Sequence, residues 1–152
     1  MGIAAEEIPG FLFFHDVAVS VQLSDLEKQV AAYKAMGFKE IHREDVLGKD
    51  QVREVLLRVG DRPNLIQLLE PLTPESPVAK QIEKNGGREG LAHVALRVAD
   101  IHKAFSARKA KGFQIIDAAP RPGSRGTTVF FVHPKTTEPA ALGYLVEVVQ
   151  EA

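Results

Sequence analysis

The stretch SDLEKQVAAYKAMGF, residues 24–38, decides the fold because the chain repeats its plan as ADIHKAFSARKAKGF at residues 99–113. In both copies apolar residues recur at helical spacing and a Gly-Phe pair follows, which predicts a helix that ends at a left-handed glycine. In the first copy, Ser24 and Glu27 have the spacing of a capping box, so we expect Ser24 to begin that helix. A repeated pattern of this length indicates two similar modules.

Strand patterns flank both predicted helices. An alternating strand precedes each helix, and a second matching pair, LIQLLE at 65–70 and LVEVVQ at 145–150, closes the repeats. Further strand-like runs lie at 52–59 and 127–132. Each half therefore reads β-α-β-β-β, and the chain is predicted to have an α+β fold.

The predicted organisation is one domain over residues 1–152. Module 1 covers approximately residues 11–72 and module 2 approximately residues 90–150. Between them, residues 76–86 form a connecting helix, with Ser76 as its N-cap and the following proline at its first turn.

The composition excludes several classes of protein. The formal net charge is −1, from 19 basic and 20 acidic residues, so nucleic acid is not an expected partner. Cysteine is absent, which excludes disulfides, thiolate metal sites and cysteine nucleophiles. No stretch resembles a membrane span or a signal peptide, so we expect a cytoplasmic protein with no membrane partner.

Superposing the two repeats places Asp16 of the strand DVAVSV (16–21) at the position of His93 in HVALRV (93–98). Because neighbouring strand residues point to opposite faces, Val17 and the valines in phase with it should pack on the helix, and Asp16 should lie on the other face. By the same alternation His15 points away from Asp16, unless a bulge reverses the phase.

The closing strands carry the second pair of polar residues, since Gln67 superposes on Glu147 between aliphatic neighbours. A polar side chain in an apolar strand costs several kcal/mol unless another group satisfies it. Four separately hydrogen-bonded residues or edge positions facing water would explain the pattern, but their equivalent positions favour one shared site. Oxygen and imidazole donors without sulfur fit a divalent ion such as Co, Mn, Ni, Mg or Zn. The donors in question are Asp16, Gln67, His93 and Glu147. With His15 in place of Asp16 the set would be softer and would carry a net positive charge.

Longer segments carry a resemblance to a known family. They are QVREVLLRV (51–59), IQLLEPLTPESPVAKQIEKNGG (66–87), GLAHVALRVADI (90–101), PRPGSRGTTVFFVHPK (120–135) and GYLVEVVQ (143–150). Together with the first helix they resemble the vicinal oxygen chelate superfamily and, within it, most closely the methylmalonyl-CoA epimerase family. The resemblance implies two βαβββ modules that form a cupped mixed sheet around a metal ion, as in the glyoxalase fold.

The resemblance also implies roles for individual residues. Gln67, His93 and Glu147 match three of the family's four metal ligands. The fourth should be a histidine directly before the Val-Ala of the first strand, where this sequence has Asp16, with His15 one position earlier. The alternation argument favours Asp16. Glu54 matches the family's proposed catalytic base, and Glu147 is a candidate for the second acid.

The function that the resemblance implies is metal-dependent epimerisation of methylmalonyl-CoA, or of a similar 2-substituted acyl-CoA, through a metal-stabilised enolate. A glyoxalase-type isomerase or lyase and a non-catalytic small-molecule binding protein are the alternatives on the same fold. The expected partners are an acyl-CoA substrate and, as is common in the family, a second copy of the chain in a homodimer. His42 and His102 are expected to be ordinary surface residues.

Overall fold

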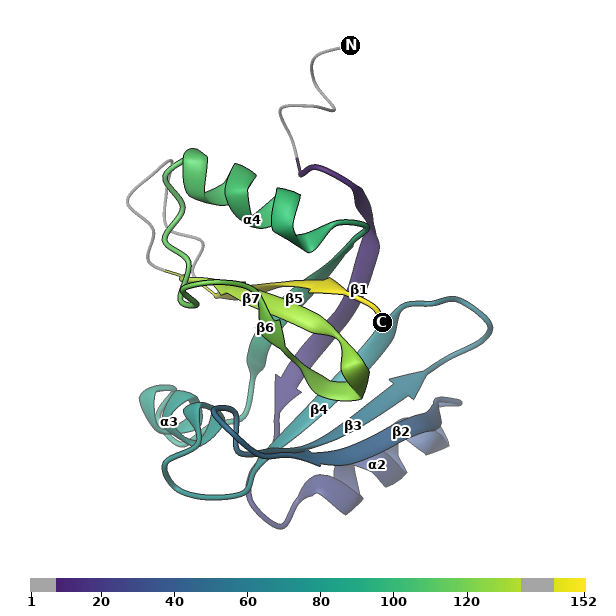
Figure 1. The fold of residues 1–152 in the computed structure, drawn as a ribbon. Coiled ribbons are helices and arrows are strands. Elements are labelled where there is room, and N and C mark those ends of the chain that lie inside the picture. The colour runs from purple at the N-terminus through teal and green to yellow at the C-terminus, as the bar shows by residue number, and fades with distance from the viewer. Residues whose placement is uncertain (1–7, 135–143) are drawn as a thin grey trace. The chain divides into compact units, whose positions relative to one another are not determined.

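The computed structural model describes residues 8–134 and 144–152, and Figure 1 shows its helices and strands. The chain divides into two compact units, one made of Met1–His15 with His93–Ala152 and the other of Asp16–Ala92. Each unit contains one module of the repeat. In the described residues no helix combines the length and the apolar character needed to cross a bilayer.

The unit Asp16–Ala92 contains a mixed sheet in the order β2-β3-β4-β1. Strands β1 and β4 are parallel, whereas the pairs β2–β3 and β3–β4 are antiparallel. The elements in chain order are β1 (Phe11–Ser20), α2 (Leu26–Ala35), β2 (Lys39–Val46), β3 (Val52–Arg58), β4 (Leu65–Pro71) and α3 (Pro77–Lys84).

One face of this sheet packs on helix α2, which Figure 1 shows lying along the strands of its unit. Val21 from the predicted helix-facing set and Leu68 from β4 pack there on Leu26 and Val30 of the helix. The predicted apolar stripe of the first repeat is therefore its buried face. On the opposite face, Ala18 and Leu69 pack with Val78 and Ile82 of helix α3.

The predicted capping box at Ser24 is wrong. Ser24 has φ +75°, the helix begins at Leu26, and the N-cap residue Asp25 makes no side-chain capping bond. The carboxylate of Glu70, a buried residue of strand β4, instead accepts hydrogen bonds from the backbone N–H groups of Ser24 at 2.8 Å and Leu26 at 3.4 Å. The cap comes from 46 positions along the chain, beyond the reach of a local pattern.

The other unit repeats this plan with the sheet order β5-β8-β7-β6. Strands β5 and β8 are parallel and the remaining pairs are antiparallel. Val98, Phe130 and Val148 pack on Ile101 and other apolar residues of the helix, as in the first repeat. Its elements are β5 (Leu91–Val98), α4 (Ile101–Ala110), β6 (Arg121–Pro122), a 3-10 turn (Ser124–Gly126), β7 (Thr128–Val132) and β8 (Leu145–Gln150).

The predicted α+β fold with two βαβββ modules is confirmed, and the modules differ mainly in one strand. Strand β2 has eight residues, whereas its counterpart β6 has two. Between the modules, helix α3 begins at Pro77, and Ser76 accepts a hydrogen bond from the N–H of Val78 at 3.2 Å.

Candidate active site

The strand register gathers polar residues on the face of the first sheet that is opposite helix α2. Ala18 and Leu56 flank Gln67, and Glu44 is paired with Glu54. Because paired residues on adjacent strands point to the same face, Glu54 and Gln67 share a face with the positions in phase with Ala18, among them Asp16. Asp16 is itself only 4% exposed.

Gln67 and Glu54 are in direct contact. The side-chain amide of Gln67 donates a hydrogen bond to Oε1 of Glu54, a carboxylate that is 1% exposed. The side-chain oxygen of Gln67 is buried and accepts no hydrogen bond from any of the described residues. The two ends of this amide therefore differ: the nitrogen orients Glu54, while the oxygen keeps its lone pairs for a cation or a donor.

His42 also faces Glu54, which corrects the expectation that it is an ordinary surface residue. Its Nε2 lies 2.7 Å from Oε1 of Glu44 and 3.9 Å from Oε2 of Glu54. The His42 side chain is half-buried at 29% exposure. Alternation in KEIHREDV could have revealed this, since His42, Glu44 and Val46 are in phase and Val46 packs against the core.

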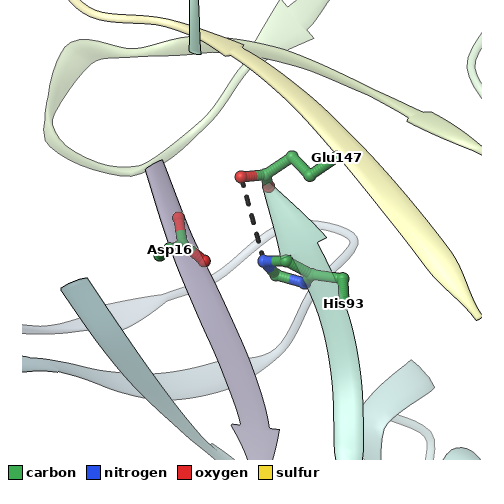
Figure 2. Close-up of side chains that lie close together, drawn as sticks. All are labelled: Asp16, His93 and Glu147. Atoms are coloured by element: carbon green, nitrogen blue, oxygen red, sulfur yellow. Dashed lines mark ion pairs between the residues drawn. The ribbon is translucent and has the colours of Figure 1, made fainter. Parts of the chain in front are cut away.

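In the other unit, His93 and Glu147 form a pair. Nε2 of His93 lies 3.9 Å from Oε1 of Glu147, the ion pair that is dashed in Figure 2, where Asp16 is also drawn. Both side chains are largely buried, and the His93 ring meets Phe131 edge-on at 5.5 Å between centroids. The register places Glu147 beside Ala95, two residues from His93 and therefore on the same face of strand β5.

His15 lies in the unit of His93 and pairs with the chain's second-last residue. Its Nε2 is 2.5 Å from Oε2 of Glu151, and Arg125 binds the same carboxylate through two hydrogen bonds of 3.0 and 3.1 Å. Burial of Glu151 favours its neutral form, but Arg125 and then His15 outweigh this effect and hold the pKa of the carboxyl below its ordinary value.

Strand β1 breaks strict alternation at these positions. His15 and Asp16 are both buried although they are consecutive, while Phe14 and Val17 on either side are exposed. The boundary between the two units falls between His15 and Asp16. Within the units, Gln67 therefore contacts Glu54, His93 lies next to Glu147, and His15 pairs with Glu151.

The comparisons with known proteins agree on one family. The sequence matches the glyoxalase/bleomycin resistance protein/dioxygenase superfamily over residues 14–131. An ethylmalonyl-CoA/methylmalonyl-CoA epimerase of Cereibacter sphaeroides is 31% identical over 134 residues, which are 87% of this chain and 94% of the relative. A mitochondrial methylmalonyl-CoA epimerase of Dictyostelium discoideum is 38% identical over 89 residues, 59% of this chain and 51% of the relative, so the chain spans about half the length of that relative.

A solved structure extends the similarity to three dimensions. It is a variant of the Streptomyces coelicolor methylmalonyl-CoA epimerase in complex with 2-nitronate-propionyl-CoA. The sequences are 32% identical, and the TM-score is 0.81 over 93% of this chain and 99% of that chain.

Proposed function

The chain belongs to the glyoxalase/bleomycin resistance protein/dioxygenase superfamily and, within it, to the methylmalonyl-CoA epimerase family, and on that premise we propose that it interconverts the stereoisomers of methylmalonyl-CoA or of a similar 2-substituted acyl-CoA. The observation that carries the proposal is Glu54, a carboxylate that is 1% exposed and shares its sheet face with Gln67. A general base needs a fixed orientation, and the Gln67 amide supplies one.

The reaction requires a proton to leave carbon on one face and return on the other. In our proposal Glu54 takes the α-proton, so the C–H bond breaks as an O–H bond forms on the carboxylate. Glu147, in the other unit, is the proposed acid that returns a proton to the opposite face. Its side chain is only 14% exposed and lies 3.9 Å from Nε2 of His93, and this placement supports the role because it orients the carboxylate.

The donor atoms fit a divalent metal ion. The buried Gln67 oxygen accepts no hydrogen bond from the described residues, and Asp16, His93 and Glu147 each offer one further ligand atom. We propose these four as ligands, and we leave His15 out because Glu151 engages its Nε2. Such donors suit Co, Mn, Ni, Mg or Zn, and a bound ion would stabilise the enolate as a Lewis acid.

The remaining parts of the proposal are the assembly and the location. We propose a homodimer in the cytoplasm. Exposed apolar side chains in the first half of β1, at Phe11, Leu12 and Phe14, support self-association, because large apolar side chains that cluster on a surface favour burial against a partner.

The proposed function is tested by following the α-proton of methylmalonyl-CoA by NMR in deuterium oxide. We expect the wild-type protein to exchange it for deuterium and to interconvert the two stereoisomers. Glu54→Gln should keep the bound metal, measured by elemental analysis, and lose at least about 100-fold in exchange rate because the base is gone. Exchange at the wild-type rate in this variant would eliminate Glu54 as the base.

A further inference from the structure

The burial of Glu54 raises a problem for repeated turnover. Under the proposed function, which this inference requires, Glu54 gains a proton each time it attacks the substrate in one direction. The carboxylate must lose that proton before it can act again. Since Glu54 is 1% exposed, bulk water has little access to its oxygens, and a neighbouring side chain has to carry the proton out.

His42 is placed to do so. Strands β2 and β3 pair Glu44 with Glu54 and His42 with Leu56, so all these side chains lie on one face of the sheet. The Nε2 atom of His42 faces Oε2 of Glu54 at 3.9 Å, while Gln67 holds the other oxygen, Oε1. A gap of 3.9 Å is longer than a hydrogen bond, and one bridging water or a small turn of the ring spans it.

Exposure increases from Glu54 outward. The side chain of Glu54 is 1% exposed, that of His42 29% and that of Glu44 33%. Oε1 of Glu44 and Nε2 of His42 form a hydrogen bond of 2.7 Å, and the group that carries the proton is the donor. The neighbouring Arg43 does not compete for these groups, because its guanidinium binds Glu27 and Glu40.

We infer that His42 is a positioning residue that faces Oε2 of Glu54, reaches it through a bridging water or a small turn of the ring, and carries the proton of Glu54 to solvent. In the first step the O–H bond of protonated Glu54 breaks as an N–H bond forms on Nε2 of neutral His42. In the second step that N–H bond breaks and the proton passes to Glu44 or directly to water. Glu54 is again a carboxylate and His42 again neutral, so the cycle balances and needs no further reactant.

The test is chemical rescue of His42→Ala. At low buffer concentration we expect its kcat to fall about 10-fold or more, with KM unchanged, because proton release becomes slow while substrate contacts stay intact. Added imidazole should restore kcat as its concentration rises. His42→Gln separates proton transfer from contact: glutamine can contact Glu54 but carries no proton, so it should be as slow as alanine. Imidazole should rescue it less, because the glutamine side chain fills the space that alanine leaves.

The control variant is His102→Ala, because His102 is exposed on helix α4 of the other unit and should retain wild-type kcat with or without imidazole. Equal unfolding midpoints of the variants establish that they are folded. Full activity of His42→Ala, or a loss that imidazole does not restore, overturns the inference and leaves the proposed function standing. A wild-type protein without epimerase activity overturns both.

Discussion

The backbone conformation at His15 and Asp16 determines which of these two candidate metal ligands is available. Alternation along the strand predicted an inward Asp16 and an outward His15. The structure buries both, because the phase of β1 shifts between them. A pattern of residue types does not encode such a shift, and the partner of His15, Glu151, lies 136 positions away. The polar positions Asp16, Gln67, His93 and Glu147 were visible because the repeat displays them twice.

The pairing of Glu151 predicts a pH-dependent contribution to stability. Because Arg125 and His15 lower the pKa of Glu151 in the folded state, its stabilising effect is complete above the unfolded pKa of about 4.3 and is lost as the pH falls through the lower folded value. Glu151→Gln should therefore destabilise the protein by about 1 kcal/mol at pH 7, and the difference from wild type should shrink toward pH 3.

Urea unfolding of both proteins at pH 7, 5 and 3 measures this difference. Wild type and variant share all other carboxylates, so their difference isolates Glu151. A gap that stays constant or widens as the pH falls would contradict the assigned charge state.

At the scale of elements, the repeat predicted the helices and most strands because local periodicity determines both. Its failures have one local cause and one long-range cause. Strand β6 is short although β2 has eight residues, because prolines at 120 and 122 limit backbone pairing. Among the described residues, Ile115 adds an isolated bridge to Val132. Helix α2 was placed correctly, but its first turn depends on a side chain from strand β4.

That dependence is testable at Glu70. Glu70→Ala removes the acceptor for two backbone N–H groups at a buried position, and we expect a loss of about 2 kcal/mol in the free energy of unfolding. Glu70→Gln keeps an oxygen acceptor and should lose less. Ser24→Ala is the matched control and should change stability by less than about 0.5 kcal/mol, because the serine hydroxyl does not cap this helix. Chemical unfolding measures the stability of all three variants. A large loss of stability in Ser24→Ala would show that the serine side chain caps the helix after all.

At the scale of the whole molecule, the proposed metal ion should contribute to the stability of the folded protein. An ion that binds only the folded protein stabilises it by about 2.7 kcal/mol at a concentration 100 times its Kd. We therefore expect a chelator to lower Tm and a restored divalent ion to raise it again.

The His93→Ala variant is the control for this experiment. It lacks one proposed ligand, so the ion should raise its Tm far less than that of wild type, whatever its starting stability. Differential scanning calorimetry with and without the ion gives both shifts. An equal shift in the two proteins would place the bound ion elsewhere.

The parallel pairing of first and last strands has a consequence for synthesis on the ribosome. The module that begins at Asp16 can complete its sheet once Pro71 has emerged, because β4 is then free to join β1. The second module cannot complete its sheet until Leu145–Gln150 has emerged, and until then the edge of β5 that pairs with β8 has no partner strand. Nascent chains should accordingly fold their first half early, while the second half is the segment exposed to chaperones and to aggregation.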